Sequence, residues 1–217
     1  MSFSEQAQEI TQAFIASQKD DVKTDIMTSF EELLSSDITK NALLTGRKAI
    51  DFSLPNALGE SVALSAQLEK GPVVLSFYRG GWCPFCNLEF AALNNILPKI
   101  KSLGASLIGV SPESPDVTMT TAEKHHLQFE VLSDTGNQIA AQYGLVMTVP
   151  ERMRPHYLSW GFDLPTLNGD ESFELPVPAT YIIDTDSQIF AHYVNNDYTQ
   201  RMEPENIITA LESLARK

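Results

Sequence analysis

The chain has 217 residues, of which 43% are hydrophobic and 20% charged, and a formal net charge of -13 at pH 7. This composition predicts a folded protein with one main core and an extension. A field this negative repels phosphate polyanions and anionic lipid headgroups, so we expect neither nucleic acid nor a membrane surface as a partner. No basic region followed by an apolar run opens the chain, and no stretch approaches the roughly 20 apolar residues that span a bilayer, which favours a cytoplasmic location.

The first 44 residues are predicted to form a helical extension without strands. Its hydrophobic residues recur at steps of three and four, as in a helix packed on one side; they are Ile10, Phe14, Ile15, Ile26, Phe30, Leu33 and Leu34. Gly46 fits a helix C-cap, so the main domain is predicted to cover residues 45–217. We expect the extension to pack on this domain or on a second subunit, which makes a homodimer possible. A partner-binding helix pair is the alternative.

The main domain alternates predicted strands and helices. The apolar, β-branched run over residues 72–78 is typical of a central strand buried on both faces, and helical spacing predicts a helix from Cys83 to Leu103. Turn-forming residues make 150–176 an inserted loop with one short helix. Further strands are predicted at 51–55, 58–64, 107–111, 129–132, 179–184 and 189–193, and further helices at 118–126, 137–143 and 205–215. The pattern predicts a three-layer α/β sandwich with a mixed central sheet.

Only two cysteines occur in the chain, Cys83 and Cys86, two residues apart. They cannot form a disulfide framework or a four-thiolate zinc site, which leaves redox chemistry as the leading use. Zinc completed by histidines is the competing interpretation, because His125 and His126 are adjacent. Neighbouring side chains on a helix point about 100° apart and would not share one metal. We therefore expect no metal and no other cofactor.

The Cys-x-x-Cys pair follows the predicted central strand and begins a helix. There the first sulfur lies among unpaired backbone N–H groups at the positive end of the helix dipole, which lowers a cysteine pKa from about 8.5 to between about 3.5 and 7.5. We therefore expect Cys83 to be an exposed nucleophile. Cys86, one turn on and more buried, can attack a mixed disulfide or a sulfenic acid formed on Cys83. Pro84 suits the first helical position, where its missing N–H costs nothing.

Several segments resemble peroxiredoxins of the alkyl hydroperoxide reductase and thiol-specific antioxidant family. They are residues 46–65, residues 131–137 with Tyr143-Gly144-Leu145, the Tyr78-Arg79-Gly80 and Cys83-Pro84-Phe85-Cys86 motifs, and residues 197–204, which resemble the C-terminal signature of a subgroup with Cys-Pro-x-Cys. The resemblance implies a thioredoxin-like fold. The residues alone leave both the cis and the trans isomer of the Val177-Pro178 bond open. The resemblance implies that the bond is cis and that it lies within van der Waals reach of the Cys83 sulfur.

Two positions depart from the typical family pattern. Gly80 stands where those proteins have threonine or serine, three residues before the first cysteine, and Pro178 stands where they have arginine. A peroxidase needs a donor that polarises the peroxide, and Arg79 is the nearest replacement, with Arg152 or Arg154 possible from the long loop. Arg79, Trp82 and Pro178 are the predicted substrate-binding residues.

Two functions are consistent with the same pair of thiols. In the first, which we favour, Cys83 reduces a hydroperoxide, Cys86 resolves the sulfenic acid to a disulfide, and a thioredoxin-type donor reduces that disulfide. In the second, the chain is a thioredoxin-like disulfide oxidoreductase: Cys83 attacks protein disulfides and Pro178 shapes the docking groove. The Trp82-to-Cys86 motif combined with Val177-Pro178 is found in such enzymes. A redox-inactive binding protein with the same fold is a third possibility.

Overall fold

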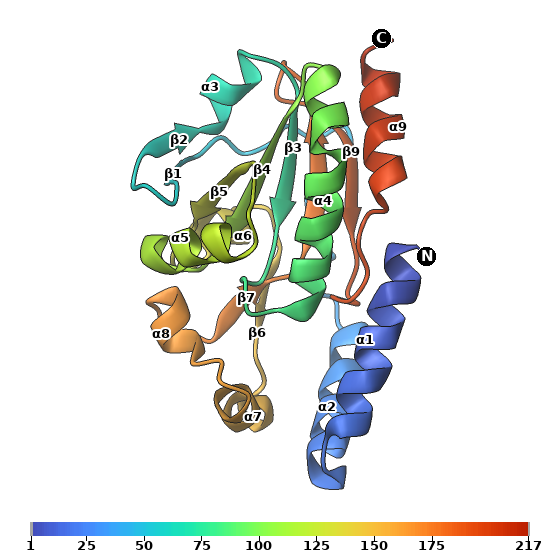
Figure 1. Ribbon diagram of the computed structural model, residues 1–217, viewed down its shortest axis with the longest axis vertical. Helices are drawn as coiled ribbons and strands as arrows, with labels where there is room; N and C mark the ends of the chain where they lie inside the picture. The colour runs from blue at the N-terminus through green and yellow to red at the C-terminus, as the bar shows by residue number, and fades with distance from the viewer. Residues whose placement is uncertain (1, 217) are drawn as a thin grey trace.

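A five-stranded mixed sheet forms the centre of the protein, shown by a computed structural model in which residues 2–216 are described (Figure 1). The strand order is β5-β4-β3-β8-β9. The strands are β3 (Val73–Phe77), β4 (Ser106–Ser111), β5 (Glu130–Ser133), β8 (Ala179–Ile183) and β9 (Ile189–Val194). β3, β4 and β5 run parallel, whereas β8 and β9 pair antiparallel. The predicted mixed sheet and its closing hairpin are confirmed.

Helices cover both faces of this sheet. Successive side chains of β3 point to opposite sides, and all of them are buried, so both faces need a covering layer. Val74 packs against α4 (Pro84–Ser102) and α9 (Pro204–Leu214). Leu75 and Phe77 face the other side, where α3 (Leu64–Leu68) and α6 (Gln138–Gln142) lie. α5 (Pro115–Lys124) packs beside β5. These layers form the predicted three-layer sandwich. No helix in residues 2–216 is both long and apolar enough to cross a membrane.

Two short hairpins and a folded insertion lie outside the central sheet. β1 (Ser53–Pro55) pairs with β2 (Ser61–Ala63), and β6 (Val146–Thr148) pairs with β7 (Glu174–Pro176). Between β6 and β7, the 149–173 segment contains η1 (Glu151–Met153), α7 (Arg154–Ser159) and α8 (Leu164–Asn168). The prediction of a loop with one short helix was wrong here. Buried apolar side chains, among them Met153, Tyr157 and Leu164, hold the segment together despite its turn-forming composition.

The N-terminal extension folds as two helices, α1 (Phe3–Ser17) and α2 (Asp20–Leu34). A capping box starts α1: the Glu5 N–H donates to Ser2 Oγ at 3.1 Å, and the Ser2 N–H donates to the Glu5 carboxylate at 2.7 Å. α1 packs against α4, and α2 packs against the 149–173 segment. Both helices thus lie on the main domain beside the N-terminal end of α4 (Figure 1). The domain boundary at residue 44 remains a prediction.

Candidate active site

β3 and the loop after it deliver Cys83 to the N-cap of α4, with Pro84 as the first helical residue. The predicted position at a helix N-terminus is therefore present. The predicted exposure of Cys83 is wrong, because Cys83 and Cys86 are both 0% exposed. Phe3 and Ala7 of α1 belong to the buried cluster around the two sulfurs, so a distant part of the chain covers the motif.

The Gly80-Gly81 turn has no room for side chains. Gly80 has φ +145°, and a Cβ there would lie 2.3 Å from the indole nitrogen of Trp82. A Cβ on Gly81 would lie 2.4 Å from Thr121 Oγ1, and the Gly81 N–H donates to the buried carboxylate of Glu113 at 2.9 Å. The departure at Gly80 thus follows from close packing of Trp82 on the turn.

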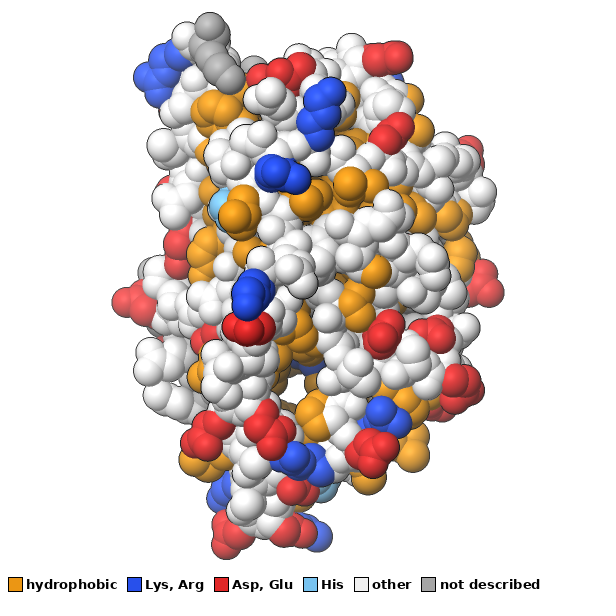
Figure 2. Space-filling view, turned by 180° about the vertical axis from the view of Figure 1, so that it is seen from behind, with side chains coloured by type: hydrophobic (Ala, Val, Ile, Leu, Met, Phe, Trp, Pro, Cys, Tyr) orange, Lys and Arg blue, Asp and Glu red, His pale blue; other side chains and the backbone are white. Residues whose placement is uncertain are grey.

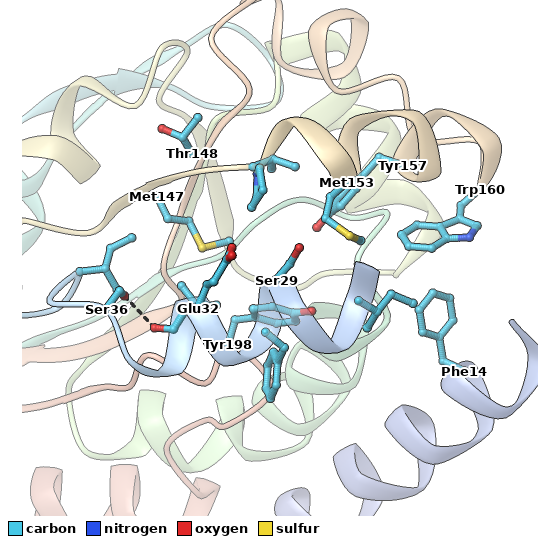
Figure 3. Close-up of a pocket in the computed structure, with 16 residues that line it drawn as sticks. Phe14, Ser29, Glu32, Ser36, Met147, Thr148, Met153, Tyr157, Trp160 and Tyr198 are labelled. Atoms are coloured by element: carbon cyan, nitrogen blue, oxygen red, sulfur yellow. Dashed lines mark hydrogen bonds between the residues drawn. The ribbon is translucent and has the colours of Figure 1, made fainter. Parts of the chain in front are cut away.

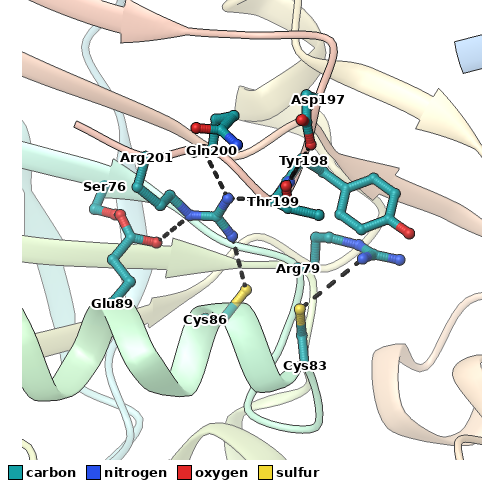
Figure 4. A network of polar contacts seen from close by, with 10 residues as sticks. All are labelled: Ser76, Arg79, Cys83, Cys86, Glu89, Asp197, Tyr198, Thr199, Gln200 and Arg201. Atoms are coloured by element: carbon teal, nitrogen blue, oxygen red, sulfur yellow. Dashed lines mark hydrogen bonds and ion pairs between the residues drawn. The ribbon is translucent and has the colours of Figure 1, made fainter. Parts of the chain in front are cut away.

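Arg79 lies beside Cys83, with Nη1 3.9 Å from Sγ (Figure 4). The arginine is only 2% exposed, and its other terminal nitrogen donates to the Tyr157 hydroxyl. Aromatic rings surround the guanidinium: its carbon lies 4.2 Å from the ring centroid of Tyr198 and 5.0 Å from that of Trp82. The structure therefore brings Arg79 and Trp82 to the predicted nucleophile, and the rings hold the positive charge in place.

A second buried arginine, Arg201, lies beside Cys86 and was missed by the sequence analysis. Its Nη2 is 3.5 Å from Cys86 Sγ, and its Nε donates to Glu89 at 2.6 Å (Figure 4). Glu89 also accepts a hydrogen bond from Ser76 Oγ at 3.2 Å. Two features of the sequence indicated that Arg201 and Glu89 have a role. Arg201 belongs to the segment resembling a family signature, and Glu89 is an acidic residue on the apolar face of α4.

The two sulfurs have opposite protonation preferences. Burial by itself raises the pKa of Cys83, but the Cys86 thiol, the guanidinium groups of Arg79 and Arg201 and the Cys86 backbone N–H outweigh it and lower the pKa to about 5. Burial and the neighbouring Cys83 raise the pKa of Cys86 well above its ordinary value, despite the opposing charge of Arg201. At neutral pH, Cys83 is thus the thiolate and Cys86 the thiol that donates to it.

We expect the ultraviolet absorbance of thiolate to titrate in the folded protein with a midpoint at about pH 5. Because the Cys83 pKa is depressed, the nucleophile is ionised at neutral pH and is lost as pH falls through this midpoint. In Cys86→Ala the midpoint should rise, since the thiol that donates to Cys83 is gone. Cys83→Ala is the matched control and should show no thiolate in the acidic range. A wild-type midpoint near that of free cysteine contradicts the proposed electrostatics.

A cavity of about 360 Å³ lies over Cys83. Cys83, Arg79 and Trp82 line it at one place, and apolar side chains of the extension and the 149–173 segment form most of the rest. An adjoining cavity of about 260 Å³ lies between α2 and this segment (Figure 3). Seen from behind, the surface has a hollow in the lower middle of the view, between two parts of the protein that extend downward (Figure 2). The nucleophile is thus buried but borders a partly open cavity.

Pro178 does not have the predicted conformation. Between residues 2 and 216 no peptide bond is cis, so the Val177-Pro178 bond is trans, and Pro178 is not among the residues lining the cavity at Cys83. Only Val177 and Pro178 separate β7 from β8, and a trans proline needs no tight turn there. The predicted cis isomer is therefore wrong, whereas the role of Pro178 as a substrate-binding residue remains a prediction.

The other predicted candidates lie elsewhere. Arg152 pairs with Glu32 of α2 at 2.9 Å, and the guanidinium of Arg154 lies 4.4 Å from the ring centroid of Phe173. Neither arginine lines the cavity at Cys83. Within residues 2–216, no group of three or more His, Cys, Asp or Glu side chains is arranged to hold a metal ion. Arg79 is therefore the only one of the three predicted arginines that the structure places beside Cys83.

Comparison with known proteins relates most of the sandwich to one family. Residues 45–192 match the AhpC/TSA family. The chain is 27% identical to the chloroplastic peroxiredoxin Q of Populus jackii over 184 residues, 83% of this chain and 75% of that protein. It is 32% identical to the peroxiredoxin Bcp of Escherichia coli K12 over 105 residues, 48% of this chain and 67% of that protein. The crystal structure of peroxidoxin BcpB from Mycobacterium tuberculosis superposes with a TM-score of 0.63 and 23% sequence identity. The alignment covers 79% of this chain and 98% of that one, and this likeness confirms the thioredoxin-like fold.

Proposed function

Because the chain belongs to the AhpC/TSA family, we propose that it is a thiol-dependent peroxidase that reduces hydroperoxides through Cys83 and Cys86. The observation that carries this proposal is the Cys83 thiolate, with a pKa of about 5, bordering a cavity beside Arg79. A thiolate in such a place is the reactive form of cysteine toward peroxides.

In the first step, the Cys83 thiolate attacks the terminal oxygen of the hydroperoxide. The O–O bond breaks, leaving a sulfenic acid on Cys83 and an alkoxide that takes up a proton to become the alcohol. The guanidinium of Arg79, 3.9 Å from the sulfur, is placed to stabilise negative charge on the departing oxygen. The cation is held by Tyr157 and Tyr198 and needs no reorganisation during the reaction.

In the second step, Cys86 attacks the sulfenic sulfur of Cys83. The Cys86 thiol loses its proton, a sulfur–sulfur bond forms, and the sulfenic oxygen leaves as water. Because burial raises the pKa of Cys86, the nearby Arg201 is needed to stabilise the thiolate as it forms. A thioredoxin-type dithiol then donates two electrons and two protons, which restores both thiols and oxidises the donor.

The protein-disulfide alternative is less compatible with this site. A protein disulfide must reach the Cys83 sulfur directly, whereas Cys83 is 0% exposed and packed beneath α1. Pro178, which was expected to shape the docking groove, is trans and does not line the cavity. A small hydroperoxide can enter the cavity that Cys83 borders, so it requires only a local displacement of side chains to reach the sulfur. The homodimer and the cytoplasmic location remain predictions, and sedimentation of the purified chain tests the first.

The decisive test compares two activities of the wild-type protein. We expect consumption of hydrogen peroxide and of an organic hydroperoxide when a thioredoxin system supplies electrons, and little reduction of insulin disulfides under the same conditions. The Cys83→Ser protein is the control for both assays. Rapid insulin reduction without peroxide consumption would support the oxidoreductase and refute the peroxidase.

A further inference from the structure

We propose that α1 and α2 form a binding site for the bulky apolar substituent of an organic hydroperoxide whose peroxide group lies at Cys83. This inference rests on the proposed peroxidase function and adds a specificity-determining element to it. Both helices precede residue 45, where the family match begins. The selectivity is therefore assigned mainly to the extension, which lies outside the matched region.

The extension contributes a large part of the lining of the cavity at Cys83. Apolar side chains of α1 and α2 face the cavity: Ile10, Phe14, Ile15, Ile26, Met27 and Phe30. The 149–173 segment adds the aromatic rings of Tyr157, Trp160 and Phe162. Such a surface offers a ligand dispersion contacts and removal of apolar area from water, but no charge to bind.

Polar groups that can hold a peroxide lie at the Cys83 end. Arg79 Nε is a buried donor without a hydrogen-bond partner within the described chain, whereas the similarly unpartnered Trp82 Nε1 packs on Gly80. By contrast, the Thr11 and Thr199 hydroxyls, which also border the cavity, already donate to Ala7 O and to the Asp197 carboxylate. The site therefore suits an amphipathic ligand, with its peroxide at Arg79 and its substituent along the helices.

The size of the space argues for a substituent larger than hydrogen. The cavity of about 360 Å³ is within the range of pockets that enclose small organic ligands, whereas hydrogen peroxide has only two heavy atoms. The adjoining cavity of about 260 Å³ shares Phe14, Ile26 and Phe30 with the first. Its other lining residues include Met147 and Met153, flexible side chains that adapt to an apolar chain (Figure 3).

Phe30 provides the sharpest test because its ring borders both cavities and packs edge-on against Tyr198, 5.6 Å between centroids. We expect Phe30→Ala to lower the ratio of kcat/KM for cumene hydroperoxide to that for hydrogen peroxide by about tenfold, the order of discrimination that small changes in an apolar pocket produce. Leu34→Ala on the same helix is the matched control, since Leu34 is 45% exposed and borders neither cavity. Its ratio should stay at the wild-type value.

Two further measurements keep the test decisive if Phe30→Ala folds poorly. Ile15→Trp, at a half-buried position of α1, fills the cavity instead of enlarging it, and should lower the same ratio. In the Cys83→Ser background, calorimetry should detect binding of cumyl alcohol, the product, and Phe30→Ala should weaken it. Unchanged ratios in Phe30→Ala and Ile15→Trp, while wild type consumes both peroxides, overturn this inference and leave the peroxidase intact. Absence of turnover with either peroxide in wild type instead refutes the proposed function.

Discussion

Replacing Cys83 by serine is expected to lower kcat/KM for hydroperoxides by about four orders of magnitude or more, as loss of a covalent nucleophile does in other enzymes. Against the opposing effect of burial, the Cys86 thiol and the guanidinium groups of Arg79 and Arg201 lower the pKa of the Cys83 thiol to about 5, but a serine hydroxyl at the same N-cap stays protonated at neutral pH. Initial rates of hydrogen peroxide consumption with a thioredoxin system measure the loss.

The matched variant is Cys86→Ser, which should retain the first attack and lose the resolving step. One equivalent of hydroperoxide should be consumed, after which Cys83 accumulates as sulfenic acid, visible in mass spectrometry as one added oxygen atom. Continued turnover would then be lost, since no disulfide forms for the donor to reduce. If Cys86→Ser loses the first-turnover burst as completely as Cys83→Ser, the assigned attacking and resolving roles are wrong.

Removing the charge of Arg201 is expected to destabilise the fold by about 3–5 kcal/mol, the cost of leaving a buried ionic partner uncompensated. Arg201 and Glu89 are 4% and 5% exposed and are joined at 2.6 Å. In Arg201→Met, the carboxyl of Glu89 keeps only its hydrogen bond from Ser76. Urea unfolding of wild type and variant measures the change in free energy of unfolding.

An exposed ion pair provides the control. Lys99 and Glu212 lie 3.1 Å apart but are 51% and 42% exposed, so Lys99→Met should cost less than about 1 kcal/mol. Adding Glu89→Leu to Arg201→Met should recover much of the lost stability, because both charges are then replaced by apolar groups. If Arg201→Met lowers the free energy of unfolding no more than Lys99→Met does, then the ion pair between Arg201 and Glu89 does not stabilise the fold as described.

The sequence by itself determined the architecture and the place of the thiols along the chain. Residues 72–78 were predicted to form a buried strand because apolar side chains predominate on both of its faces. Cys83-Pro84 predicted a helix start because proline lacks the N–H that is unpaired there. The strand and the helix start depend on neighbours within a few residues, which a sequence displays directly. The depressed pKa of Cys83 was expected from the helix N-terminus alone, whereas in the structure distant Arg201 also lowers it.

Only the tertiary structure decided what surrounds the two sulfurs. Arg201 is 112 residues from the carboxylate that it contacts, and α1 at the start of the chain packs over Cys83, which local pattern had placed at the surface. The isomer of Pro178 likewise depends on how β7 leads into β8. Contacts between distant segments are set by packing of the whole core, because each buried side chain must find partners wherever the fold brings them.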